Sequence, residues 1–339
     1  MEKVRRVLES YHIYPVDIEK VSEKLFKIKG NKHHYALKKS HLHEEKLSDW
    51  LEVYRIAQAT NLQSILPVYL TNSNQLYVKE GNDIYYLTPW IDSTNRNHPI
   101  EKIYQHIGYI HAKTKKSQPI TADIREKLKE DFLLYKKQMI DSRKKLLFHV
   151  EEFEQEHFMS PVELLVCTQY RDMVQVYYLL EKRINQYIES LEDVSETKVT
   201  LCHGRLKDSH FLSGNQYYFI NWEQANYQHP IVDLTQFIKN KTLYYDSDKR
   251  LLLDKFKFYM EENRLEIHEL TLLAIYLLDP SAYLEIINDY ISRESDQTMI
   301  DTVIRLQRLH RQLVFGISFS EFVEEEYEMI SLDESSSES

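Results

Sequence analysis

Hydrophobic and polar positions change their spacing near residue 88 of the chain. Before that point, short apolar runs alternate with polar positions and are separated by Asn, Ser and Gly turns, which predicts strands over residues 16–28, 35–39, 65–70, 76–79 and 84–87. Residues 2–10 predict a short helix, and residues 44–60 carry apolar positions at helical spacing. Strands and a helix in this order predict a small α+β lobe.

Beyond the turn-rich stretch that ends near residue 98, helical spacing dominates. It predicts helices over residues 100–114, 122–141, 162–191, 251–263, 266–278 and 299–316, interrupted by short strands at 199–202 and 217–220. We therefore divide the chain into an N-terminal lobe (1–88), a hinge or linker (89–98), a helical C-terminal lobe (99–325) and a tail (326–339). The tail is acidic and serine-rich, and this composition predicts disorder.

Composition excludes several classes of protein. The chain has 339 residues, 42% hydrophobic and 28% charged, which is typical of a globular protein with two lobes. Its net charge of −10 argues against nucleic-acid binding. No apolar run approaches the ~20 residues of a membrane span, and the first residues lack an apolar signal core, so we expect neither membrane insertion nor export. Cys167 and Cys202 lack paired spacing, which favours structural thiols in a reducing compartment.

The segment Leu201–Leu212 and the strand ending in Asn221-Trp222-Glu223 have the layout of a phosphotransferase site. In that layout a loop of the form His-x-Asp-x-x-x-x-Asn supplies a catalytic carboxylate and a metal ligand, and an Asp after the next strand supplies the second ligand. This chain has Arg205 in place of the base, His210 in place of the Asn and Asn221 in place of the Asp. The spacing is kept, but the groups that perform the chemistry are changed.

These replacements predict that phosphoryl transfer is lost. Arg205 is permanently cationic and cannot accept a proton, and Asp208 is the alternative base. Magnesium prefers oxygen ligands, whereas His210 offers nitrogen and Asn221 an uncharged carbonyl, so Glu223 is the one carboxylate left to hold a metal. Two interpretations of Arg205 stay open: an ion pair with a buried carboxylate such as Asp233, or an anion-binding role.

Four local motifs carry a resemblance to a known family. They are Tyr35-Ala36-Leu37-Lys38, the run from Tyr85 to Ile91, the loop Leu201–Leu212, and Trp222-Glu223 followed by Pro230 and Asp233. In order and spacing they resemble the aminoglycoside phosphotransferase and choline-kinase-like group, and within it the spore-coat (CotS-type) branch of endospore-forming bacteria. The resemblance covers roughly residues 16–320. It implies an α+β, two-lobed protein-kinase-like fold.

The resemblance also implies roles for individual residues. Lys38 would contact nucleotide phosphates, and the backbone from Leu87 to Trp90 would form the hinge that holds the base. His203 would brace the loop by donating to backbone. The alternative for Lys38 is an exposed strand lysine, or one paired with Glu44, Glu45 or Glu52 of the following helix.

Together, the family and its altered site predict a catalytically inactive pseudokinase that serves as a structural or interaction component of the spore coat. We expect no cofactor. The resemblance implies synthesis in the mother-cell cytoplasm, recruitment to the endospore coat, and coat or coat-morphogenetic proteins as partners. One alternative is an active small-molecule phosphotransferase that uses ATP and magnesium. Another is a nucleotide-binding switch without transfer.

Overall fold

The computed structural model describes residues 2–92, 98–244, 248–293 and 297–328, apart from the side chain of Glu44. These residues form two compact units. The N-terminal unit contains residues up to Lys115 together with the segment Thr200–Gln228, and the C-terminal unit contains Lys116–Val199 and the chain from His229 onward. The segment that carries the altered loop is therefore part of the N-terminal unit. Residues 329–339, most of the predicted tail, lie outside the described residues, as do residues 93–97 of the predicted linker.

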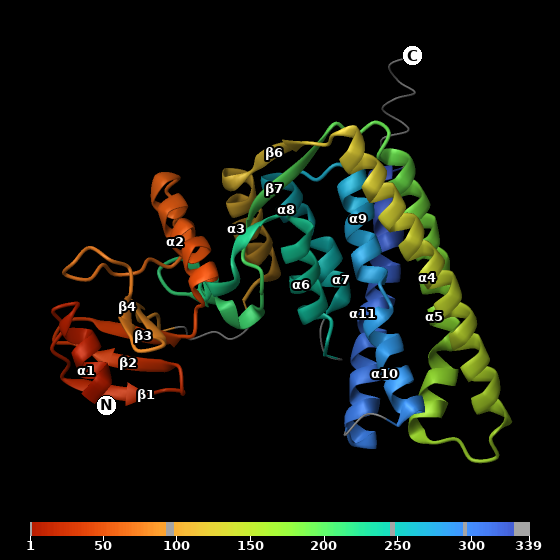
Figure 1. The fold of residues 1–339 in the computed structure, drawn as a ribbon, viewed down its shortest axis with the longest axis horizontal. Helices are drawn as coiled ribbons and strands as arrows, with labels where there is room; N and C mark the ends of the chain where they lie inside the picture. Colours follow the sequence, from red (N-terminus) through yellow and green to blue (C-terminus); the bar gives the residue numbers. More distant parts are fainter. Residues whose placement is uncertain (1, 93–97, 245–247, 294–296, 329–339) are drawn as a thin grey trace. The chain divides into compact units, whose positions relative to one another are not determined.

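The N-terminal unit is built on an antiparallel sheet with the strand order β1-β2-β3-β5-β4 (Figure 1). Its strands are β1 (Asp17–Lys20), β2 (Leu25–Lys29), β3 (His34–Ser40), β4 (Val78–Glu80) and β5 (Asp83–Pro89). The single strand predicted over 16–28 is wrong, because a turn at Ser22, whose N–H donates to the Leu25 carbonyl at 3.1 Å, divides it in two. The strand predicted over 65–70 is also wrong, since Ile65 makes only an isolated bridge with Phe219.

Helix α1 (Glu2–Glu9) covers one face of this sheet. Val4, Val7 and Leu8 form a buried core with Leu37 and Leu87 of the central strands. Two further helices belong to the unit, α2 (Glu44–Ala59) and α3 (Ile100–Thr114), and both begin where the sequence pattern predicts. Their hydrophobic positions recur at helical spacing, so each helix buries one side.

The segment 200–228 adds short strands and turns to the N-terminal unit. After β7 (Glu196–Cys202) come the 3-10 turn η1 (Asp208–His210), the hairpin of β8 (Phe211–Ser213) and β9 (Tyr217–Phe219), the turn η2 (Trp222–Gln224) and β10 (Asn226–Gln228). Asn226 pairs with Cys202 in the register of β10 and β7. The hairpin is held by backbone bonds, with the Phe219 N–H donating to the Ser64 carbonyl at 2.7 Å.

The C-terminal unit is mainly helical. Its helices are α4 (Ala122–Gln155), α5 (Pro161–Ser190), α6 (Ile231–Lys241), α7 (Lys249–Asp254), α8 (Lys257–Glu262), α9 (Ile267–Leu278), α10 (Ser281–Ser292) and α11 (Met299–Val323), followed by the π-helical turn η3 (Glu324–Glu328). The strand β6 (Lys116–Pro119) pairs with the first half of β7. Helix α5 begins with a reciprocal capping box, in which the Ser160 hydroxyl accepts from the Glu163 N–H and the Glu163 carboxylate accepts from the Ser160 N–H.

Several helix predictions for this unit are incomplete. Helix α4 does not end at residue 141 but continues to Gln155, because Leu146, Val150 and Phe153 extend its buried face. The helix predicted over 251–263 is two short helices, and α6, α10 and β6 were not predicted.

One stretch of the C-terminal unit is long and apolar enough to cross a membrane. Within Ile267–Ser292 an 18-residue window reaches a mean hydropathy of 1.5, so the expectation that no apolar run approaches the length of a membrane span is wrong. However, 67% of that window is buried inside the protein. Helix α9 also ends at Leu278, before Asp279-Pro280, and α10 begins after it. Burial and the interruption are typical of core helices rather than of a span.

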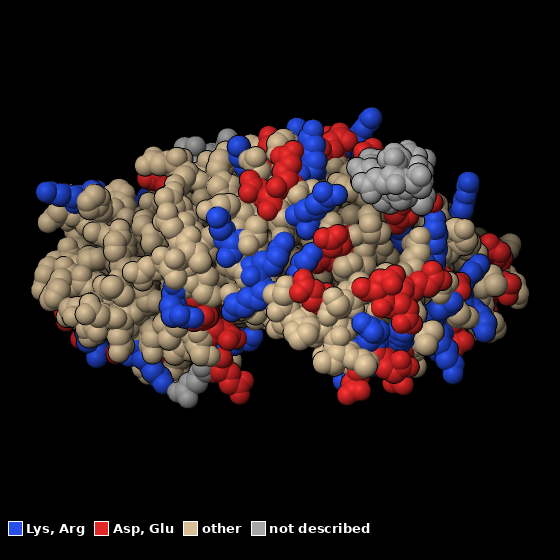
Figure 2. Space-filling model, turned by 90° about the horizontal axis from the view of Figure 1, so that it is seen from above, with Lys and Arg blue, Asp and Glu red and all other residues tan. Residues whose placement is uncertain are grey.

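Charged side chains of both signs are interspersed on the face of the protein that Figure 2 presents. The excess of acidic residues therefore does not form one acidic patch on that face.

Candidate functional site

The register of β3 and β5 places the candidate lysine on the face of the sheet opposite α1. Lys38 pairs directly with Tyr86, and Ala36 with Thr88. Because side chains alternate along a strand, these residues share one face, while Leu37 and Leu87 point into the core beneath α1.

A cavity of about 410 Å³ lies on this face, lined entirely by residues of the N-terminal unit. Its walls are mostly apolar, and its polar lining residues are Ser22, Lys24, Lys38, Thr88, Ser209 and Asn221. The apolar and aromatic lining residues are Leu25, Ala36, Tyr54, Leu66, Tyr86, Pro89, Trp90, Ile91, Leu212 and Ile220. Its size and mostly apolar lining are typical of a small-molecule site.

At one end of the cavity, Lys38 is bound by the strand that follows the altered loop. Its ammonium group forms an ion pair with Glu223 and donates to the Asn221 side-chain oxygen at 2.5 Å. The Tyr86 hydroxyl donates to the same Glu223 carboxylate at 2.7 Å. The sequence suggested partners for Lys38 on the following helix, but the structure gives it Glu223 instead.

This network is largely removed from solvent. The side chains of Lys38 and Glu223 are 22% and 15% exposed. Burial alone would raise the pKa of Glu223, but Lys38 and Tyr86 hold that pKa below its usual value. Burial lowers the pKa of Lys38, although Glu223 opposes this shift. Burial also raises the pKa of Tyr86 far above its usual range, so Tyr86 stays a neutral donor to the carboxylate.

His203 sits at the start of the loop and is buried. Its Nε2 atom lies 2.8 Å from the Ile220 carbonyl, and its Nδ1 atom accepts from the Arg205 N–H at 3.3 Å. The ring therefore ties the loop to the strand after it. Gly204 follows in a left-handed conformation (φ +75°), where an added Cβ would lie 2.0 Å from the Gln224 carbonyl oxygen, so this turn requires glycine.

The two replaced loop residues lie in different surroundings. The Arg205 side chain is exposed to solvent. His210 is half-buried at the end of η1 and stacks on His203 with ring centroids 5.1 Å apart. Burial, with His203 and Lys38 nearby, lowers the pKa of His210 to about 4, so the ring is neutral at pH 7. Among the described side chains, nothing bonds its buried Nδ1 atom.

The residues at the metal positions do not fit magnesium. Asn221 adopts a left-handed conformation (φ 69°), which asparagine tolerates, and its side-chain oxygen accepts from Lys38. Glu223 is the single carboxylate, and Lys38 and Tyr86 engage it. A hard dication needs several free anionic oxygens, whereas here a resident ammonium group holds the carboxylate. We therefore derive no step through a metal.

The two predicted hinge residues have different environments. Trp90 lines the cavity, its indole N–H donates to Asp92 at 2.7 Å, and the Lys27 ammonium lies 4.6 Å from its ring centre. Leu87 does not line the cavity: its side chain is in the core, and its carbonyl accepts from the Tyr69 N–H at 2.8 Å. The alternation of β5 turns the Leu87 side chain to the opposite face, and the predicted role of the backbone from Leu87 to Trp90 in holding a ligand stays a prediction.

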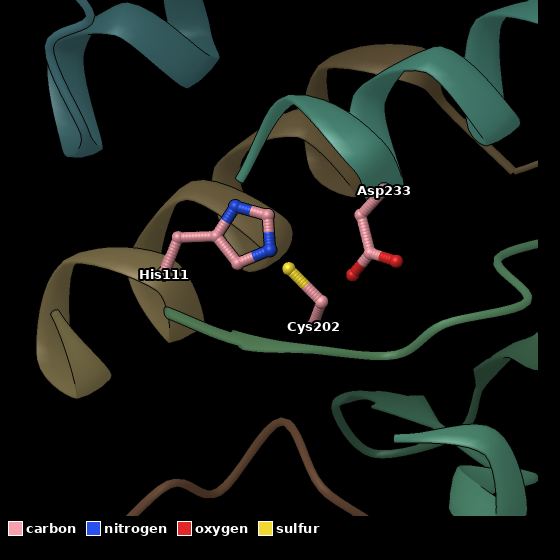
Figure 3. A group of neighbouring side chains, drawn as sticks. All are labelled: His111, Cys202 and Asp233. Carbon is pink, nitrogen blue, oxygen red and sulfur yellow. The ribbon is translucent and has the colours of Figure 1, made fainter. Parts of the chain in front are cut away.

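A second pair of buried groups lies elsewhere in the N-terminal unit. His111 comes from α3 and Cys202 from the end of β7, and their ligand atoms lie within 4.8 Å of each other (Figure 3). Figure 3 also labels Asp233, which belongs to the C-terminal unit. The Cys202 thiol donates to the Gln228 carbonyl at 3.6 Å, and Thr200 lies at 3.5 Å from it. Cys202 thus packs as a buried thiol inside the β7–β10 pair.

Sequence reasoning missed Tyr86 and Tyr54. Tyr86 binds Glu223, and the buried Tyr54 lies close enough for the Glu223 charge to raise its pKa, after burial as the main cause. The strand pairing would have identified Tyr86, since it is the direct cross-strand partner of Lys38.

Comparison with solved structures shows the fold. An aminoglycoside phosphotransferase from Alicyclobacillus acidocaldarius matches with a TM-score of 0.67 at 16% identity, covering 95% of this chain and 96% of that chain. The AMP-bound spectinomycin phosphotransferase matches with a TM-score of 0.56 at 15% identity, covering 94% and 96%. An amicoumacin kinase in complex with AMP-PNP, Ca2+ and Ami matches with a TM-score of 0.51 at 12% identity, covering 92% of this chain and 91% of that chain.

A scan of family models and a search of curated protein sequences found no match. The structural matches extend over more than nine-tenths of the chain, but identities of 16% or less establish the fold alone. The predicted fold class is confirmed: the chain has the α+β kinase-like fold seen in aminoglycoside phosphotransferases.

Proposed function

We propose that this chain is a catalytically inactive, kinase-like protein that acts through binding. One observation carries the proposal: the lysine and the carboxylate at the centre of the site are bound to each other. The Lys38 ammonium group pairs with Glu223 and donates a hydrogen bond to Asn221, so its partners are protein groups. A nucleotide phosphate or a metal would have to displace this buried network.

The two replaced loop residues, Arg205 and His210, do not substitute for the missing base. A base that activates a hydroxyl must accept a proton, and the guanidinium of Arg205 has no acceptor. His210 can accept a proton in its neutral form. However, with a pKa of about 4 it is a weak base, far from the value that is most effective at neutral pH. The replaced positions Arg205, His210 and Asn221 thus supply neither a carboxylate base nor a carboxylate for a metal, and Asp208 in η1 remains the alternative base.

The test of inactivity is a phosphoryl-transfer assay with radiolabelled ATP, magnesium and a panel of aminoglycosides, choline and related amines. We expect no turnover above the buffer background. The matched variant carries Arg205→Asp, His210→Asn and Asn221→Asp, which restores the residue types of the layout. Turnover by the parent chain that disappears in Asn221→Ala would instead establish the alternative, an active small-molecule phosphotransferase.

A second candidate function, ligand binding without transfer, is favoured by the cavity itself. Its apolar walls and the Trp90 ring persist although the phosphate end is neutralised. A planar, uncharged heterocycle would gain burial there without breaking the Lys38–Glu223 pair. Adenosine and ATP compared side by side by thermal shift test this. Adenosine should stabilise the protein at least as well as ATP does, and stabilisation by ATP alone would contradict the idea.

For the biological setting, we propose a structural or interaction role in the spore coat, supported by the sequence resemblance. On this proposal the protein is made in the mother-cell cytoplasm and joins the endospore surface through contacts with coat or coat-morphogenetic proteins. A fluorescent fusion followed through sporulation tests it. A ring around the forespore is expected, and a diffuse signal at all stages would contradict the assignment.

A further inference from the structure

A second cavity of the N-terminal unit lies against helix α2. Its volume is about 670 Å³, which is within the range of small-molecule sites. It is lined by the C-terminal half of α2, by the loop that joins α2 to β4, and by the β8–β9 hairpin. All three segments belong to the N-terminal unit. We call this hollow the α2 cavity; it is separate from the cavity beside Lys38, although Tyr54 lines both.

The polar lining of the α2 cavity offers almost no charge to a ligand. Among the described lining residues, Arg55 is the only one with an ionic side chain, and its guanidinium donates to both carboxylate oxygens of Glu52. The other polar groups are side-chain amides and tyrosine hydroxyls. They are Gln58, Asn61, Gln63, Asn74 and Gln216, with Tyr54 and Tyr218. Among these residues an anion would find no uncommitted cation, and a cationic amine would find no carboxylate.

Side-chain amides and hydroxyls suit a ligand that carries many hydroxyl groups. Each of them combines hydrogen-bond donors with acceptors, and so does a sugar hydroxyl. The Gln216 amide is oriented by the protein, because its Nε2 atom donates to the Gln63 carbonyl at 3.2 Å. Leu51, Ile65 and Val68 add apolar surface to the same lining, and the C–H faces of sugar rings pack well against such surface.

The loop wall of the α2 cavity is fixed before any ligand binds. The Leu66 N–H donates to the Phe219 carbonyl of the hairpin at 3.1 Å, and the Tyr69 N–H donates to the Leu87 carbonyl of β5 at 2.8 Å. A preformed wall lowers the entropic cost of binding. The same bonds use backbone groups that a peptide would need in order to add to this wall as a strand. They favour recognition by side chains, and hence a sugar over a peptide.

We propose that the α2 cavity binds a neutral oligosaccharide. The side-chain amides of Gln58, Asn61 and Gln63 hydrogen-bond to its hydroxyl groups, and its ring faces pack against the aliphatic lining. Arg55 stays bound to Glu52 and takes no part. This inference goes beyond the proposed function and does not depend on the loss of catalysis, since it uses neither the altered loop nor the network around Lys38.

A glycan array probed with the fluorescently labelled chain, residues 1–339, tests the proposal. The array carries neutral oligosaccharides, among them maltotriose, cellotriose and triacetylchitotriose, together with sulfated and sialylated glycans and a set of extended peptides. We expect binding to neutral glycans. Sulfate or sialic acid should not improve binding, because the one cation of the described lining is already paired with Glu52.

Variants of two exposed glutamines test the position of the site. Gln58→Leu with Gln63→Leu keeps the approximate size of both side chains and removes two groups that hydrogen-bond to the ligand. The affinity for the best-bound neutral glycan should fall about tenfold or more. Gln138→Leu with Gln155→Leu makes the same change at exposed positions of α4 and should leave the affinity at the parent level.

NMR signals of the side-chain amides locate the ligand in the parent chain and so separate lost contacts from lost folding. During titration with that glycan, the amide signals of Gln58 and Asn61 should shift, whereas those of Gln138 and Gln155 should not. Several results would overturn the proposal: no binding to any neutral glycan, tighter binding of sulfated or sialylated glycans, or peptides that shift the Gln58 and Asn61 signals in their place. An equal affinity in the cavity variant and the parent would overturn it as well.

Discussion

Replacing Glu223 by glutamine should destabilise the N-terminal unit strongly. The substitution keeps the size of the side chain and leaves the Lys38 ammonium, 22% exposed, without its counter-charge. Breaking a fully buried ion pair costs about 3–5 kcal/mol, and the partial exposure of this pair reduces the expected loss to about 2–4 kcal/mol. The Tyr86 hydroxyl keeps an acceptor in the glutamine carbonyl, so its contribution to the loss should be small.

The assay is denaturant unfolding at pH 7 of the parent, Glu223→Gln, Lys38→Met and the double variant. The double variant should recover much of the loss, because it removes the uncompensated charge, giving a coupling energy of about 2 kcal/mol. Glu23→Gln, which breaks the exposed pair with Lys20, is the matched control and should leave the midpoint unchanged.

The pH dependence supplies a second readout. The pKa of Glu223 is lower in the folded protein than its usual value of 4.5. The stability that its charge contributes is therefore present above pH 4.5 and is lost as the pH falls through the folded pKa. Glu223→Gln should flatten this acid limb. An unfolding free energy within about 0.5 kcal/mol of the parent value, with an unchanged acid limb, would refute the idea that the pair organises the site.

Three further changes test other parts of the description. The pKa of His210 in the folded protein, about 4, lies below its usual value of 6.5, so on acidification the unfolded chain binds the proton first. The unfolding free energy of the parent should therefore fall by up to about 2 kcal/mol between pH 6.5 and pH 4. His210→Gln should lose less unfolding free energy over that range. Gly204→Ala should abolish soluble expression or lower the melting temperature sharply, because its Cβ would meet the Gln224 carbonyl oxygen at 2.0 Å. Gly81→Ala should cost only about 1 kcal/mol, because Gly81 shares the left-handed conformation (φ +69°) but its Cβ would meet only Lys3 Nζ, at 3.9 Å. Ser160→Ala should cost about 1 kcal/mol in unfolding free energy through loss of the α5 cap, and an unchanged value would show that the capping box contributes nothing.

The sequence predicted the elements with strong periodicity and missed those that depend on tertiary contacts. Residues 100–114 and 44–60 were predicted as helices because their apolar positions repeat over three turns or more. The segment 65–70 has the composition of a strand, but its backbone bonds go to the β8–β9 hairpin and to β5, which no local pattern reveals. The turn at Ser22 was missed for a similar reason, since the apolar alternation runs through it.

The sequence identified three residues of the site but did not predict that they bind each other. Lys38, Asn221 and Glu223 were each singled out, yet 183 residues separate Lys38 from its bonded partner Asn221. Only the assembled N-terminal unit shows that the lysine and the remaining carboxylate neutralise each other. The same assembly turns Leu87 into the core and brings Tyr86 into the network.

The most direct test of the central claim is calorimetric titration of the protein with ATP, with and without magnesium. If Lys38 and Glu223 are bound to each other, neither the Lys38 ammonium group is free for the phosphates nor the Glu223 carboxylate for the metal. Binding should then be weak, and its affinity should be the same in both titrations. A magnesium-dependent increase in affinity of tenfold or more, lost in Glu223→Gln, would contradict the account.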